Sequence, residues 1–310
     1  MHEHIARAMY YFSVHLLFAS IVASAAWALT SILRASATTK YWIWVATAFN
    51  FVLPSGALID KLWAPHLTWA KPLAVIGDPV WDMTQGRTAV ILGVIWMTGA
   101  FSMLMRLISR IRKERGEAKV QDGLNDRGDT SNFVTDGIPV SFGDSHPSPA
   151  VRGVLSPRIL LPTGIDRLLS QREFRAVLIH ELAHARRRDN LIRLLYEASL
   201  CALWFHPLMW LAGARIGLYR ELSCDESVIR RAHGQALVSA LAKLAVPEQP
   251  RFLQATASSH LSYRLARLSG PPQTTYRAAS LLLASVFAAV VAAGVFQTIA
   301  HTACCFAMKR

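Results

Sequence analysis

The sequence has 310 residues and a net charge of +13, and 53% of its residues are hydrophobic while only 17% are charged. So few charges are unusual for a soluble enzyme. The positive charge comes without a recognisable nucleic-acid-binding motif, so we expect no direct contact with nucleic acid and assign many basic residues to the flanks of membrane segments. The four cysteines lack the paired spacing of a structural zinc site or a disulfide framework.

Several apolar segments are long enough to cross a bilayer. The first is free of charge, and its apolar run exceeds that of a typical signal peptide. We predict four transmembrane helices, at about residues 8–33, 41–59, 88–105 and 278–300.

Basic residues indicate the orientation of these segments. Directly after the third span, residues 106–119 carry six arginines or lysines against two glutamates. An excess of lysine and arginine marks the cytoplasmic side of a membrane. We therefore expect a multi-pass protein of the cell inner (plasma) membrane, with three spans in residues 1–107, a cytoplasmic domain in residues 108–277, and the fourth span and a short tail in residues 278–310.

The start of the cytoplasmic domain is expected to contain a small sheet. Residues 116–132 are polar and rich in Gly, Asp and Asn, which predicts a linker. Short β-prone pieces follow at residues 138–142, 150–155 and 158–161, separated by Gly, Pro and Ser. An exposed edge of this sheet can bind an extended peptide by strand addition, or can serve only to support a neighbouring helix.

The main chemical signal is His180-Glu181-Leu182-Ala183-His184. In a helix, His180 and His184 lie one turn apart on the same face and can bind one Zn²⁺ ion. Glu181 then lies where it can act as a general base on a water whose pKa the ion lowers. Ser170 and Glu173 match a capping box that starts this helix. The pattern predicts the active site of a zinc metalloendopeptidase.

Residues 191–217 are apolar enough to resemble a further span, but Arg193 and Glu197 interrupt the first half and His206-Pro207 breaks the middle. A span here would separate His180 and His184 from the residues after 217 by the bilayer. We therefore expect a helical hairpin, which either enters the membrane or packs in the protein.

After this hairpin, Glu221 is the expected third metal ligand, because catalytic zinc commonly takes two histidines and one glutamate. Asp225 lies one turn further along the same helix face and is expected to orient a ligating histidine. Glu226 is the nearest competitor for the ligand role. Tyr219 and His206 are the candidates for a residue that stabilises the transition state. Together these features predict a mainly α integral membrane protein with about four transmembrane helices and an inserted α+β zinc protease domain.

The sequence resembles the BlaR/MecR-type membrane zinc metallopeptidases. The resemblance rests on the four spans, on His180-Glu-Leu-Ala-His184 after the third span, and on Glu221-Leu-Ser-Cys-Asp225; it extends to residues 151–162, to Arg188-Asp-Asn-Leu191 and to Phe205-His-Pro-Leu208. It implies a gluzincin-like protease domain with His180, His184 and Glu221 as zinc ligands.

The resemblance also implies a partner, since family members with a sensor domain couple β-lactam binding outside the cell to proteolysis that relieves a transcriptional repressor. Only about ten residues follow the fourth span here, so we expect no penicillin-binding sensor domain in this chain. The expected substrate is a protein or peptide, such as a repressor. A non-catalytic signalling or scaffold protein in which zinc staples the domain is the alternative function, and a transporter is a weaker one.

Overall fold

The computed structural model describes residues 2–52, 87–125, 133–143, 148–244 and 263–268, together with residues 280, 281 and 285. It divides into two compact units. The first comprises Met1–Met105, Ala198–Arg215 and Tyr276–Arg310, and the second comprises Arg106–Glu197 and Ile216–Thr275. The predicted domain limits at residues 107 and 277 remain a prediction.

Among the residues that the structure describes, two helices are long and apolar enough to cross a membrane. They are α1 (His2–Ile32), with its apolar window at His15–Ile32, and α5 (Arg87–Asn125), with its window at Val90–Gly116. The second predicted span corresponds in part to α2 (Ala37–Asn50), and its remainder beyond residue 52 lies outside the described residues. Most of the predicted fourth span also lies outside them. Four spans therefore remain a prediction.

The expected linker at residues 116–132 is wrong for its first part, because α5 continues as a helix through Asn125. Glu117, Ala118, Lys119 and Gln121 are good helix formers and allow the helix to continue past Gly116. The remainder of the expected linker lies outside the described residues.

Within the first unit, α1 and α2 pack together. Ser36 caps the start of α2, where its hydroxyl accepts a hydrogen bond from the Thr39 amide at 3.1 Å. The indole of Trp44, which is fully buried, donates to the Thr30 hydroxyl at 3.2 Å and so links α2 to α1.

The second unit contains a four-stranded sheet, with strands at the three predicted places, of which the second ends at Arg152 and not at residue 155, and one further strand before them. Its strands are β1 (Phe133–Thr135), β2 (Ile138–Phe142), β3 (Ala150–Arg152) and β4 (Arg158–Leu161), in the order β1-β2-β4-β3. The β2 and β4 strands are parallel, whereas the other two pairs are antiparallel. Asp136 and Gly137 both have positive φ, as the tight turn between β1 and β2 requires. β3 is an edge strand.

The predicted active-site helix is α7 (Gln171–Arg187), which follows the short α6 (Ile165–Leu168). Both bonds of the predicted capping box are present, since the Ser170 hydroxyl accepts from the Glu173 amide and the Glu173 carboxylate accepts from the Ser170 amide. One face of α7 packs on β4 and on α10 (Gly234–Leu244), with Val177, Leu161 and Leu237 in the shared core.

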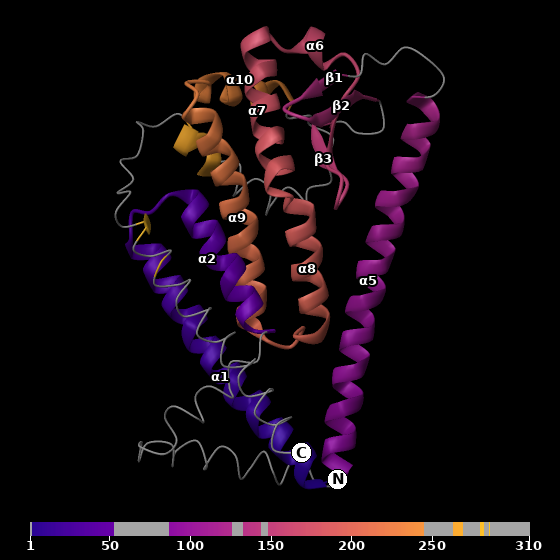
Figure 1. Ribbon diagram of the computed structural model, residues 1–310, viewed down its shortest axis with the longest axis vertical. Coiled ribbons are helices and arrows are strands. Elements are labelled where there is room, and N and C mark those ends of the chain that lie inside the picture. Colours follow the sequence, from indigo (N-terminus) through magenta and orange to yellow (C-terminus); the bar gives the residue numbers. More distant parts are fainter. Residues whose placement is uncertain are drawn as a thin grey trace, which may run out of the picture. The chain divides into compact units, whose positions relative to one another are not determined.

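The expected helical hairpin is present as α8 (Asp189–Ala202) and α9 (Pro207–Ile229), which run antiparallel (Figure 1). Pro207 stands at the first position of α9, where its missing N–H costs no helical hydrogen bond. The tip of the hairpin belongs to the first unit, where it contacts α5. The Trp204 indole donates to the carbonyl of Trp96 at 3.2 Å, and the Trp96 indole donates to the carbonyl of Ala202 at 2.9 Å.

Gly99 makes this contact between the hairpin tip and α5 possible. A Cβ at this position would lie 2.1 Å from the Trp204 ring, so any other residue would push the tryptophan away. Gly99 lies inside the apolar window of α5.

Candidate metal centre

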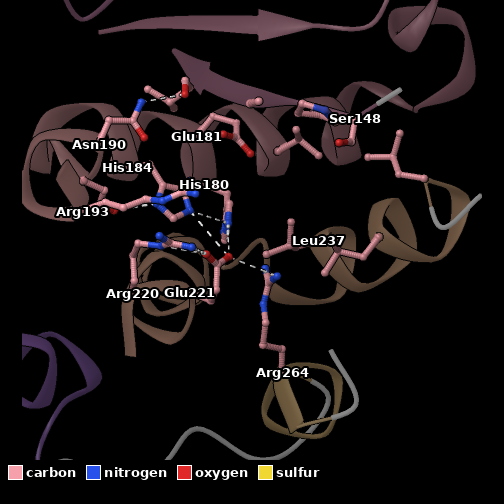
Figure 2. Close-up of a pocket in the computed structure, with 17 residues that line it drawn as sticks. Ser148, His180, Glu181, His184, Asn190, Arg193, Arg220, Glu221, Leu237 and Arg264 are labelled. Atoms are coloured by element: carbon pink, nitrogen blue, oxygen red, sulfur yellow. Dashed lines mark hydrogen bonds and ion pairs between the residues drawn. The ribbon is translucent and has the colours of Figure 1, made fainter. Parts of the chain in front are cut away.

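The two histidines of α7 lie together on one face of the helix, as the spacing predicts. Their Nε2 atoms are 3.2 Å apart and point toward the same place (Figure 2). His180 is buried and His184 is nearly so. Helix α7 can place them precisely because the capping box fixes its start and the core fixes its buried face.

Glu221 from α9 completes a group of three. Its Oε2 atom lies 3.6 Å from Nε2 of His180 and 3.8 Å from Nε2 of His184. Three atoms bound to one tetrahedral zinc ion at ordinary bond lengths lie roughly 3.3 Å apart. The observed separations are close to this value, so these residues fit a zinc ion as three of its ligands.

An aspartate carboxylate lies at the other ring nitrogen of each histidine. Nδ1 of His180 lies 3.1 Å from Oδ1 of Asp225, and Nδ1 of His184 lies 2.7 Å from Oδ2 of Asp189. A carboxylate at Nδ1 keeps the proton there and leaves Nε2 available for a metal. The structure therefore places Asp225 at His180 and Asp189 at the corresponding nitrogen of His184.

Asp189 reaches His184 because the chain turns sharply at the end of α7. Arg188 caps the helix in the left-handed conformation, with φ 55° and ψ 46°. Few residues other than Gly adopt this conformation, which commonly ends helices. The turn starts α8 at Asp189 and directs its carboxylate back to the last turn of α7.

Two arginines hold the two aspartates. Arg187 contacts both carboxylate oxygens of Asp189 at 2.6 Å, and Arg264 contacts both oxygens of Asp225 at 2.8 and 2.9 Å. Both contacts have the bidentate geometry that arginine favours with carboxylates. Arg264 also lies 3.4 Å from Oε2 of Glu221 (Figure 2).

The pKa shifts follow from this arrangement of charges. Burial by itself lowers the pKa of His180, but Asp225 and Glu221 outweigh it and raise the pKa to about 9. At His184 burial also lowers the pKa, but Glu221 and Asp189 outweigh it and raise the pKa well above its usual range. At Glu221 burial raises the pKa, and the two histidines overcome it and hold it well below 4.5. The site therefore favours positive charge between its imidazoles, as a metal cation would supply.

Glu181 lies beside His180 and lines the same pocket, which has a volume of about 460 Å³ (Figure 2). Edge strand β3 borders this pocket through Ala150 and Val151, and Leu237 contributes an apolar wall from α10. A pocket of this size accommodates a few residues of a peptide. Asn190 fixes the end of β3, because its amide donates to the carbonyls of Val151 at 2.9 Å and Gly153 at 3.2 Å.

The other candidates from the sequence lie elsewhere. The Glu226 carboxylate accepts a hydrogen bond from Arg267, with Oε1 and Nη2 2.6 Å apart, and Glu226 is not part of the three-residue group. His206 belongs to the first unit, where its ring packs on Phe51 and its Nε2 lies 3.2 Å from the Ser20 hydroxyl. Tyr219 is buried and is not among the described residues that line the pocket.

Sequence reasoning missed Asp189, Arg187 and Arg264. Asp189 carried a signal, since it directly follows the arginines at the end of the histidine helix, one turn from His184. Arg264 carried none, because it lies 39 residues beyond Asp225.

Comparison with known proteins adds a family and several relatives. Residues 12–268 match the family described as BlaR1 peptidase M56. The chain is 25% identical over 175 residues to the methicillin resistance mecR1 proteins of Staphylococcus aureus and Staphylococcus epidermidis, which covers 53% of this chain and 30% of each relative. It is 37% identical over 83 residues to the regulatory protein BlaR1 of Bacillus licheniformis, covering 27% of this chain and 14% of that protein. The matched regions thus span less than a third of these relatives.

Proposed function

The chain belongs to the BlaR1 peptidase M56 family, and from this premise we propose that it is a membrane-embedded zinc-dependent endopeptidase that cleaves a cytoplasmic or membrane-proximal protein. The observation that carries the proposal is the convergence of His180, His184 and Glu221 in one pocket, with Glu181 beside them. A purely structural zinc site usually has four protein ligands and needs no such carboxylate.

The reaction assigns a separate task to each residue. His180, His184 and Glu221 would hold the zinc ion, while Asp225 and Asp189 would orient the two imidazoles. The ion, when bound, supplies Lewis acidity that polarises a carbonyl and acidifies water. Glu181 accepts a proton from the attacking water and delivers it to the departing amine, which completes hydrolysis of the peptide bond.

The pocket favours a peptide in extended form. Edge strand β3 lies along one side of the pocket, and an extended segment can pair with an exposed strand edge through main-chain hydrogen bonds. The Asn190 amide already occupies the carbonyl of Val151, so the substrate pairs with β3 at other backbone groups. This arrangement selects an unfolded or flexible part of the substrate protein.

The biological setting that we propose is signal transduction across the inner membrane, with the domain at residues 108–277 in the cytoplasm. Support comes from the basic residues at 106–119, in the C-terminal half of α5, and from the relative named regulatory protein BlaR1. A transcriptional repressor is the proposed class of substrate. The hairpin tip is proposed to enter the membrane, because it bonds to the apolar window of α5.

A comparison of the wild type with Glu181→Gln tests the endopeptidase directly. The full chain, purified in detergent, is incubated with a library of quenched fluorescent peptides in the presence of zinc or of EDTA. We expect cleavage by the zinc-loaded wild type, none in EDTA, and a loss of about 10²–10⁴-fold in Glu181→Gln, which should still bind zinc. Undiminished cleavage by zinc-loaded Glu181→Gln, or no cleavage of any peptide by the wild type, contradicts the proposal.

A further inference from the structure

Arg264 connects the helical turn at residues 263–268 to the candidate metal centre through a nearly buried ion pair. Its side chain is 12% exposed, and its partner Asp225 is 2% exposed. The guanidinium donates from Nε to Oδ2 of Asp225 and from Nη2 to Oδ1. Its third nitrogen, Nη1, lies 3.4 Å from Oε2 of Glu221. One side chain thus reaches both carboxylates that α9 contributes to the site.

These contacts act on the atoms that would face the metal. Oδ1 of Asp225 is the oxygen that meets Nδ1 of His180, so the plane of this carboxylate sets the orientation of the imidazole. Oε2 of Glu221 is the oxygen that faces Nε2 of both histidines. A lysine could supply the charge, but only a planar guanidinium can make the parallel bonds and the third contact together.

Arg267 lies one turn from Arg264 and offers an internal comparison. It pairs with Glu226 at 2.6 Å, and both side chains are nearly buried, at 13% and 11% exposure. Both arginines therefore fasten the same helical turn to α9 with similar burial. Of the two, Arg264 alone contacts the group formed by His180, His184, Glu221 and Asp225 among the described residues.

We propose that Arg264 is a positioning residue of the metal centre, which fixes Asp225 against His180 and Glu221 toward both histidines so that the three ligand atoms converge. This inference rests on the proposed zinc site. It assigns to a residue far along the chain a role that goes beyond fastening the helical turn to α9.

The test measures zinc affinity by competition with a chelator for the wild type, Arg264→Ala, Arg264→Lys and the matched control Arg267→Ala, all as full chains in detergent. Thermal unfolding of the metal-free proteins reports how far each variant weakens the attachment of residues 263–268 to α9. We expect both alanine variants to unfold at lower temperature. Zinc affinity should fall roughly 10–100-fold in Arg264→Ala and stay within about twofold of the wild type in Arg267→Ala.

Two further measurements distinguish positioning of the metal ligands from attachment of residues 263–268 to α9. Cobalt(II) in place of zinc should give a changed visible spectrum in Arg264→Ala and an unchanged one in Arg267→Ala. In an Asp225→Asn background, Arg264→Ala should cost less than about threefold in additional zinc affinity, because the two residues act in one network. Arg264→Lys should fold and show a smaller loss of zinc affinity, so it serves where Arg264→Ala does not fold.

Each of three results would overturn the inference. The first is wild-type zinc affinity in both Arg264→Lys and Arg264→Ala. The others are an equal loss of zinc affinity in Arg267→Ala, and fully additive losses of zinc affinity when Arg264→Ala is combined with Asp225→Asn. Failure of the proposed function has a different signature, namely a wild-type protein that binds no zinc or cleaves no peptide. The two failures are therefore distinguishable.

Discussion

His184 and His180 are held by the same chemistry, a carboxylate at Nδ1 and an arginine behind it, but the supporting groups come from different parts of the chain. At His184 they are Asp189 and Arg187, from the corner between α7 and α8. At His180 they are Asp225 on α9 and Arg264 in the turn at residues 263–268.

The difference separates local from long-range assembly of the site. The His184 half forms wherever the α7–α8 corner forms, because Arg188 ends α7 in the left-handed conformation and returns Asp189 to the last turn. The His180 half exists only after α9 and the helical turn that carries Arg264 have packed. Changes in the first half should therefore destabilise the α7–α8 corner itself, whereas changes in the second should leave that corner folded and loosen the contacts of α9 with residues 263–268.

The largest effect is expected at Arg187, which joins the His184 half to α9. Besides Asp189 it donates to the Ser223 hydroxyl, to the Arg220 carbonyl at 3.1 Å and to Cys224 Sγ at 3.2 Å. Arg187→Ala leaves Asp189 buried without its arginine, and breaking such a pair costs about 3–5 kcal/mol of unfolding free energy. Chemical denaturation in detergent measures this loss.

Arg186→Ala is the matched control for this change. Arg186 is the neighbouring residue, and its ion pair with Asp136 is about half exposed on both sides. We expect a change within about 0.5 kcal/mol. Equal destabilisation by the two variants would contradict the role given to Arg187.

A smaller effect is expected when each aspartate loses its charge. Asp189→Asn and Asp225→Asn should each weaken zinc binding by about 10–100-fold, because the imidazole loses the negative charge that holds the proton at Nδ1 and orients the ring. Thermal unfolding of the metal-free proteins then compares the two halves of the site, since Asp189→Asn should also lower the thermal stability of the α7–α8 corner. Zinc titration with a chelator gives both affinities. Wild-type affinity in either variant would show that the histidine in that half needs no support.

The smallest effect concerns the opposite end of α7 and depends on pH. Lys243 and then Ser239 donate to Glu173 and, with the Ser170 amide, lower the pKa of its carboxyl to about 2 from 4.5. A depressed pKa in the folded state stabilises the fold above about 4.5, and this contribution is lost as the pH falls toward 2. Melting temperatures of metal-free protein between pH 6 and pH 3 should thus fall more for the wild type than for Glu173→Gln. Parallel curves would contradict this assignment.

The sequence was sufficient for those parts of the site that depend on local periodicity. The capping box at Ser170 and Glu173, the helical spacing of His180 and His184, and the turn of helix between Glu221 and Asp225 each follow from backbone geometry over a few residues. The structure brings these residues together. Their roles as ligands and base remain proposals.

The remaining features depend on choices that local patterns do not determine. The polar stretch after Gly116 can form either a linker or a helix, and the structure extends α5 to Asn125. Arg188 in the left-handed conformation is unusual for a residue with a side chain, so the return of Asp189 was not predictable from propensity. Arg264 reaches Asp225 only through tertiary packing, which no local pattern encodes.

Zinc stoichiometry tests the central claim, that His180, His184 and Glu221 form one metal site, most directly. The full chain is purified in detergent as the wild type, His184→Ala and Glu221→Gln, and bound zinc is measured per chain. The account predicts about one zinc ion per wild-type chain and clearly less in both variants. A wild type without zinc would contradict the metal centre itself, and normal zinc binding by Glu221→Gln would show that α9 does not supply the third ligand.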